Sequence, residues 1–234
     1  MNENVEKAFG ALKTYDWGQD YKVVVPIDEA IVASQGDDAE RKKLETRLAA
    51  VLATDVSYDA KQFVCRKLMV IGTKASVPAL AALLSDQKLS HMARYALERI
   101  SAPEAGEAMR DALSKLDGEL KIGMISSLGV RGEAASVAPL QALLADGNAA
   151  AAKAAAHALG AIGSAAADKA LAASKPSDQT QAAVADASLT CAEKLLAAGD
   201  KAAALATYNR LLKGSPSKMV RLAAMRGRLA CAGT

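Results

Sequence analysis

Two histidines and three cysteines are the side chains best suited to metal binding or nucleophilic catalysis in this 234-residue chain. They are His91, His157, Cys65, Cys191 and Cys231, and they lie far apart in the sequence. Zinc sites and disulfide frameworks need such residues at short, repeated spacings, and no pair here has one. We therefore predict no metal site, and we expect the cysteines to act as small buried hydrophobic side chains.

Motifs of the common catalytic and nucleotide-binding classes are also missing from the sequence. It has no G-x-S-x-G nucleophile turn, no phosphate-binding loop and no dinucleotide-binding fingerprint. Catalysis requires several reactive groups that converge on one site. We therefore predict no catalytic residues, no cofactor and no enzymatic activity.

The composition favours closely packed helices. Hydrophobic residues make up 51% of the chain and aromatic residues only 3%, so alanine and leucine dominate the apolar content. These two residues are the strongest apolar helix formers, which predicts an all-α fold. The net charge of +3 is small, which argues against a dedicated nucleic-acid binder.

The sequence carries no signal for membrane insertion or export. It lacks a run of 18 apolar residues, and its first residues are not a basic segment followed by a hydrophobic one. We therefore expect a soluble protein, cytoplasmic by default. A chain whose signal had been removed would look the same, so the compartment stays open.

An internal repeat of about 31 residues organises the middle of the chain. The pattern Leu-Gly-x-x-Gly at residues 128–132 returns at residues 159–163, and related patterns occupy residues 97–101 and 68–72. The repeat frame predicts four units, at about residues 57–86, 87–117, 118–147 and 148–175.

Each predicted unit has two helical halves around a hinge of small residues. In the third unit we expect helices over residues 119–130 and 135–145, because apolar residues follow helical spacing there. Gly72, Gly132 and Gly163 stand at equivalent positions after the first helix. We expect each of these glycines to adopt a left-handed conformation that ends the helix.

The closest motif matches to a known family are AAHALGAIG at residues 155–163 and SVPALAALL at residues 76–84. They resemble the bacterial HEAT-like repeats, which include those of phycobilin lyases and belong to the armadillo-type folds. The resemblance implies a right-handed α-α superhelix that serves as a binding scaffold. By analogy alone, it also leaves open a chaperone-like lyase that attaches bilin chromophores.

Two other classes of HEAT-like proteins are alternatives to a scaffold. The di-iron hydroxylases carry ligands that resemble paired His-Glu motifs, and the sequence has no His-Glu dipeptide, so we predict that the chain is not one of them. DNA glycosylases of HEAT-like fold place aromatic residues, acidic residues and phosphate-contacting cations beside the lesion. The predicted repeats contain no tryptophan, but a nucleic-acid-binding or lesion-processing protein remains the main alternative.

Residues 1–56 lie outside the repeat frame and are predicted to form an N-terminal helical cap. Helices are expected over residues 3–12 and 37–53, with a short helix that Pro26 begins. Trp17, the chain's one tryptophan, is predicted to pack within this cap; the alternative is a binding role for its ring.

Residues 176–234 are predicted to continue the same solenoid. Several positions there follow the spacing of one tetratricopeptide repeat, namely Ala192, Leu195, Gly199, Ala204, Tyr208 and Pro216. HEAT-like geometry for this segment remains the alternative. The sequence shows no evident polar cap at its end. We therefore expect that the chain is a domain of a longer protein or that its last helix packs on a partner.

The predicted binding surface is the inner, concave face of the first helices. Positions counted from the framing leucine of each unit select Gln62, Arg66, His91, Arg94, Tyr95, Glu98, Ser126, Lys153 and His157. The same rule also selects Gly129 and Gly160. His91 and His157 lie two repeats apart, about 20 Å at the usual helix spacing, so they cannot share a metal ion. We predict a non-enzymatic scaffold that binds a protein partner, with Tyr95 and the arginines as anchors.

Overall fold

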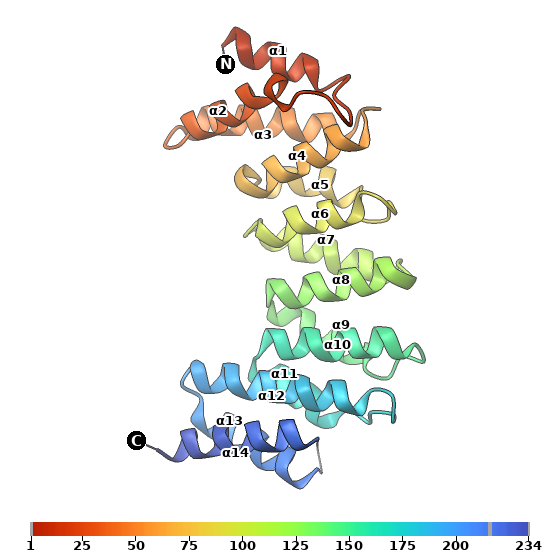
Figure 1. Ribbon diagram of the computed structural model, residues 1–234, viewed down its shortest axis with the longest axis vertical. Coiled ribbons are helices and arrows are strands. Elements are labelled where there is room, and N and C mark those ends of the chain that lie inside the picture. The colour runs from red at the N-terminus through yellow and green to blue at the C-terminus, as the bar shows by residue number, and fades with distance from the viewer. Residues whose placement is uncertain (1, 215–216, 234) are drawn as a thin grey trace. The chain divides into compact units, whose positions relative to one another are not determined.

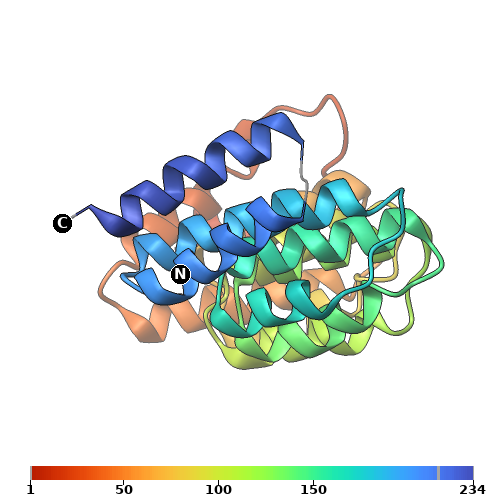
Figure 2. The ribbon, with the colours of Figure 1, turned by 90° about the horizontal axis from the view of Figure 1, so that it is seen from below.

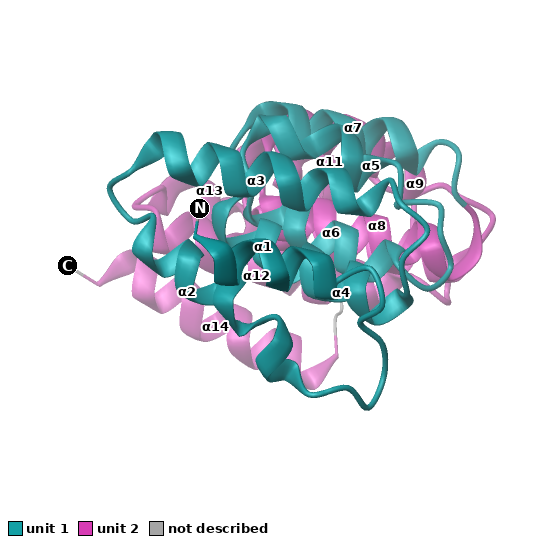
Figure 3. Cartoon of the chain, turned by 90° about the horizontal axis from the view of Figure 1, so that it is seen from above, with its two compact units in different colours: residues 1–116 teal, residues 117–234 magenta. Residues whose placement is uncertain are grey.

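The computed structural model describes residues 2–214 and 217–233. Within this part of the chain all regular structure is helical, and no strand occurs. The predicted all-α solenoid class is confirmed. The chain divides into two compact units, residues 1–116 and residues 117–234, drawn in teal and magenta in Figure 3. We describe each unit separately.

Unit 1 contains the first seven α-helices (Figure 1). They are α1 (Glu3–Ala11), α2 (Val25–Ala33), α3 (Asp38–Leu52), α4 (Tyr58–Ile71), α5 (Val77–Ala81), α6 (Ser90–Arg99) and α7 (Pro103–Leu113), with short 3-10 segments η1 (Tyr21–Val23) and η2 (Lys74–Ser76). Helix α4 packs on α6, and α5 packs on α7. The first and second helices of these two pairs therefore stack on their equivalents, as in helical-repeat proteins.

The N-terminal helices begin where the sequence supplies capping side chains. The Asn2 side chain accepts a hydrogen bond from the Val5 amide at 3.0 Å, and the Asp37 carboxylate does the same for Glu40. Such bonds satisfy backbone donors that the first turn of a helix leaves free. Helices α1 and α3 accordingly start at the predicted places.

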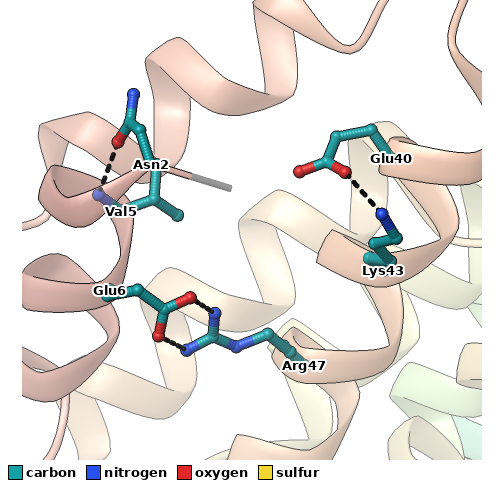
Figure 4. Close-up of polar contacts among 6 residues, drawn as sticks. All are labelled: Asn2, Val5, Glu6, Glu40, Lys43 and Arg47. Carbon is teal, nitrogen blue, oxygen red and sulfur yellow. Dashed lines mark hydrogen bonds and ion pairs between the residues drawn. The ribbon is translucent and has the colours of Figure 1, made fainter.

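An ion pair joins α1 to α3 (Figure 4). Arg47 on α3 donates to both carboxylate oxygens of Glu6 at 2.5 and 3.0 Å, and its guanidinium lies 4.0 Å from the Phe9 ring centre. Leu44 and Leu48 of α3 are fully buried. Because this ion pair is partly exposed, it contributes little stability, and apolar burial such as that of Leu44 and Leu48 contributes more.

A buried carboxylate connects α3 to the turn after α4. Glu45 is only 2% exposed. One of its oxygens accepts from the Thr73 amide at 2.7 Å and from the Ser76 hydroxyl at 2.6 Å, and the Thr73 hydroxyl donates to the same carboxylate. A buried carboxylate needs such donors to offset the loss of water. Glu45 therefore fixes the turn that leads from α4 into α5.

Unit 2 contains the remaining helices (Figure 2). They are α8 (Gly118–Arg131), α9 (Val137–Leu143), α10 (Ala149–Ile162), α11 (Ala165–Ala173), α12 (Gln181–Ala197), α13 (Lys201–Lys213) and α14 (Lys218–Ala232), with η3 (Ala134–Ser136) before α9. Helix α10 packs on both α8 and α12, and α9 packs on α11. The stacking of equivalent helices seen in unit 1 is thus repeated here.

Two glycines allow the first helices of unit 2 to approach closely. A Cβ atom on Gly129 would lie 2.8 Å from the Ala158 Cα, and one on Gly160 would lie 2.8 Å from the Ala187 carbonyl oxygen. Gly129 and Gly160 are buried at these contacts. Their predicted place on the concave face is therefore wrong, because α10 covers Gly129 and α12 covers Gly160.

The predicted left-handed glycines are confirmed at two of three positions. Gly132 ends α8 with φ +69° and Gly163 ends α10 with φ +64°. Gly72 is instead extended, with φ −62° and ψ 140°, so the expectation for it is wrong. It has a different reason to be glycine, because a Cβ atom there would lie 2.3 Å from the Leu68 carbonyl oxygen.

The last helices bury the positions that the repeat pattern singled out. Ala192, Ala204 and Tyr208 are almost fully buried, and Gly199 has φ +87° between α12 and α13. Pro216, the last position of the tetratricopeptide pattern, lies outside the described residues. Both the tetratricopeptide reading and the predicted boundaries near residues 57 and 176 stay predictions.

Candidate functional site

The nine predicted binding residues lie on four helices, divided between the two units. Unit 1 carries Gln62 and Arg66 on α4 and His91, Arg94, Tyr95 and Glu98 on α6, and unit 2 carries Ser126 on α8 and Lys153 and His157 on α10. Gln62, Arg94 and Glu98 are half-buried, and the other six are exposed. The two sets are therefore considered one unit at a time.

Helix α6 presents two rings and a half-buried guanidinium. The rings of His91 and Tyr95 lie one helical turn apart, with their centres 6.0 Å from each other. Burial lowers the pKa of Arg94, and the nearby Glu98 carboxylate opposes this change. The exposed rings can stack on a ligand, whereas Arg94 is partly enclosed and makes a poorer surface anchor than predicted.

The predicted residues of unit 2 form a thinner polar surface. Lys153 and His157 are exposed and stand one turn apart on α10. Ser126 on α8 donates a hydrogen bond to the Ile122 carbonyl oxygen at 3.1 Å. The Ser126 hydroxyl is therefore already bonded within its own helix. The side chains available for recognition on this surface are those of Lys153 and His157 on α10.

The predicted packing role of Trp17 is wrong, because 89% of its side chain is exposed. The loop between α1 and η1 is anchored by other rings. Tyr15 and Tyr21 both lie against Phe63 of α4, with ring centres 6.3 and 6.0 Å from it. With Phe63 covered by these tyrosines, the tryptophan is left at the tip of the loop, where Gly18 turns the chain with φ +81°.

Trp17 stands beside a cavity of about 280 Å3 within unit 1. The loop contributes aromatic and polar groups to this cavity, and α4 contributes Gln62, Phe63, Arg66 and Lys67. Two of the predicted binding residues, Gln62 and Arg66, therefore meet the exposed tryptophan. We call this group of Trp17, Tyr21, Gln62, Arg66 and Lys67 the Trp17 site.

Charges in the Trp17 site are arranged unevenly. Lys67 lies 2.5 Å from an Asp28 oxygen and 4.6 Å from the Phe63 ring centre. Tyr21 donates a hydrogen bond to the same Asp28; burial raises the pKa of Tyr21, the Asp28 bond adds to this, and Lys67 opposes it. Lys67 is thus held inside unit 1, while the exposed Arg66 is available to an incoming group.

The sequence predicted two of the five residues of this site as binding residues. The repeat frame selected Gln62 and Arg66, but Trp17 and Tyr21 precede the first repeat and follow no periodic pattern. One local signal was present, since Trp17 is followed directly by a glycine, a residue typical of tight turns. A ring at the tip of such a turn has few neighbours to pack against.

In residues 2–214 and 217–233 no group of three or more histidine, cysteine or acidic side chains is placed to hold a metal ion. None of the described helices combines the length and the apolar character needed to span a bilayer.

A family model described as HEAT repeats matches residues 107–190. This match supports a HEAT-like repeat family. The matched segment runs from α7 into α12, where the stacked helix pairs of unit 2 lie, and it fits a helical solenoid.

Among solved structures, the chain is similar to human deoxyhypusine hydroxylase in complex with glycerol. The sequences are 17% identical, the alignment covers 98% of this chain and 96% of that chain, and the TM-score is 0.38. This similarity is too weak to carry an inference about activity. No curated protein matches the chain in sequence.

Proposed function

We propose that the chain is a non-enzymatic scaffold that binds a protein partner, and that the Trp17 site is part of its binding surface. The observation that carries this proposal is the exposure of Trp17, 89% of which faces solvent beside the cavity. Covering an exposed tryptophan ring with a partner removes apolar surface from water, which lowers the free energy of the complex. An exposed ring next to a cavity is therefore a natural anchor for a partner.

The surroundings of Trp17 have the composition of an interface centre. Tryptophan, tyrosine and arginine dominate binding energy at protein interfaces, and here Trp17, Tyr21 and Arg66 meet at one cavity. Tyr21 is 46% exposed, so a partner can reach it as well. The site suits a protein segment that offers an apolar side chain to Trp17 and a hydrogen-bond acceptor to Arg66.

The remaining predicted residues form a secondary candidate surface within each unit. Helix α6, which packs on α4, adds the exposed rings of His91 and Tyr95. In unit 2, we propose binding by Ser126, Lys153 and His157 because they lie on the first helices of their predicted repeats. Both sets are secondary to the Trp17 site, because neither borders a cavity that contains an exposed tryptophan.

The proposal also includes a finer family assignment for the predicted repeats and for the C-terminal helices. Four HEAT-like repeats of the bacterial phycobilin-lyase type, followed by one tetratricopeptide-like unit, are consistent with a scaffold that presents side chains along stacked helices. If the partner is a nucleic acid or a bilin, the affinity capture described next recovers nucleic acid or pigment with the chain in place of a protein.

The test is affinity capture from a native lysate with three forms of the chain. They are the unaltered protein, the double variant Trp17→Ala/Arg66→Ala and the control Val130→Ala, which removes a 66% exposed apolar side chain from unit 2. We expect the unaltered chain and the control to retain the same protein, and the double variant to lose it. Equal circular dichroism must show that all three are folded. Retention by all three forms would contradict the proposed surface.

A further inference from the structure

The last helix of unit 2 exposes a row of large apolar side chains. On α14, Met219 is 75% exposed, Leu222 49%, Met225 42% and Leu229 69%. The same helix buries Val220 and Ala224. Because α14 packs on α12 and α13, the buried positions face those helices and the exposed ones do not.

The exposed apolar residues form one stripe along α14. Leu222, Met225 and Leu229 follow the spacing i, i+3, i+7, which places them on a single face of a helix. Val220 and Ala224 lie on the opposite face. The inner contact is close, because a Cβ atom on Gly227 would lie 2.2 Å from the Tyr208 ring. Helix α14 is therefore seated firmly on α13 while its outer stripe stays uncovered within the described residues.

Positive charge borders this stripe on both sides. By helical spacing Arg221 and Arg228 lie along one edge and Arg226 along the other, and Lys218 stands in the first turn. All four side chains are exposed, and α14 contains no aspartate or glutamate. The outer face is thus an apolar stripe between cations, without any acidic residue of its own helix to neutralise them.

We propose that the outer face of α14 docks an acidic amphipathic helix of a partner protein. The apolar stripe is complementary to a helix with leucine-like residues at i, i+3 and i+7, and the arginines at its edges are complementary to carboxylates that flank such a stripe. Helix-on-helix stacking is also how α12, α13 and α14 already pack in this unit. A docked helix continues that arrangement by one layer.

Charge argues against a second copy of the chain as the occupant. A symmetric pair would bring the same face of α14 from each copy together, so the arginines that border the stripe would face arginines of the other copy. Like charges at an interface cost free energy. This surface lies in unit 2 and is independent of the Trp17 site, so either can fail without the other.

The probe is a synthetic peptide of 15 residues, the length of α14, with a leucine stripe flanked by glutamates. Its matched controls are a scrambled peptide and a peptide with lysine in place of every glutamate. Binding of labelled peptide to the full chain is measured by fluorescence anisotropy. We expect the acidic amphipathic peptide to bind at least about tenfold more tightly than either control.

Two double variants test where the peptide binds. Leu222→Ser/Leu229→Ser should weaken binding about tenfold or more, whereas the control Val130→Ser on α8 should leave it unchanged. Arg221→Glu/Arg228→Glu should reverse the preference, so that the lysine peptide binds better than the glutamate peptide. The reversal is a gain of binding, which a merely unfolded variant cannot produce.

Three outcomes would overturn the proposal. The first is equal binding of the acidic and scrambled peptides to the unaltered chain. The second is a preference for the acidic peptide that survives the Arg221→Glu/Arg228→Glu exchange. The third is binding to phosphatidylserine vesicles that depends on Leu222 and Leu229 when no peptide binds, which would assign the face to a lipid surface instead.

Discussion

Burial controls the reactivity of the three cysteine thiols. Cys65 and Cys191 are fully buried, as expected from the sequence, whereas Cys231 on α14 is only half-buried, so the expected burial is wrong for it. Burial raises the pKa of Cys65 to about 12. It also raises the pKa of Cys191 to about 11, with a smaller contribution from Asp168. Because the thiolate is the reactive form, both buried thiols stay almost entirely protonated and unreactive at pH 8.

The resulting prediction concerns the number of thiols that react at pH 8. In the folded chain we expect iodoacetamide to modify Cys231 rapidly and Cys65 and Cys191 very slowly, whereas all three should react in urea. Mass spectrometry of peptides after a timed reaction measures each site. Rapid modification of Cys65 in the folded chain would contradict its burial.

Glu45 is a buried charged residue whose substitution should destabilise unit 1. In Glu45→Gln the remaining oxygen can still accept from the Thr73 amide and the Ser76 hydroxyl, but a neutral amide replaces the charged carboxylate that strengthens these buried hydrogen bonds. We expect the free energy of unfolding to fall by about 2 kcal/mol. Urea denaturation measures this, with Glu107→Gln on the exposed side of α7 as the control. Equal midpoints for the two variants would show that the Glu45 network adds no stability.

At the residue scale the sequence predicted burial better than exposure. The cysteines and the framing leucines are apolar residues within periodic helices, so their surroundings follow from the pattern. Trp17 belongs to an irregular loop, where the burial of a ring depends on which of the neighbouring aromatic side chains contacts Phe63. Tyr15 and Tyr21 occupy that place, and no local rule distinguishes them from Trp17.

At the scale of elements, the helices were predictable because apolar spacing and capping residues act locally. The third predicted unit expected helices over residues 119–130 and 135–145, and the structure has α8 (Gly118–Arg131) and α9 (Val137–Leu143). The contacts between elements were not predictable in the same way. Gly129 and Gly160 matched a surface position in the repeat frame, yet the next helix of the stack covers both.

A glycine exchange tests this close contact between helices. Gly129→Ala should lower the free energy of unfolding by about 1–3 kcal/mol, since the new methyl group meets Ala158 at 2.9 Å or less. The matched control is Gly10→Ala in α1, where no atom lies within 4 Å. Alanine is the better helix former, so the control should gain up to about 1 kcal/mol. Opposite signs are expected in urea denaturation, and a gain for both variants would contradict the contact.

At the scale of the whole molecule, fold and function were unequally predictable. The repeat period and the alanine-rich composition indicated an all-α solenoid, and the described helices and the HEAT-repeat match support it. Stacked helices position side chains without specifying a ligand, so the partner does not follow from the fold. Two surface features that narrow the choice of partner come from the coordinates. They are the exposure of Trp17 in unit 1 and the apolar stripe bordered by cations on α14 in unit 2.

Trp17 also supplies the most direct measurement of the proposed function, because it is the chain's one tryptophan and its fluorescence reports on a single site. The protein recovered by affinity capture is titrated into the full chain while Trp17 is excited, using a partner fragment without tryptophan. We expect the emission to shift to shorter wavelength and acrylamide quenching to fall as the partner covers the ring. Saturating partner with unchanged emission and quenching would show that binding leaves Trp17 exposed, and the Trp17 site would then not be the binding surface.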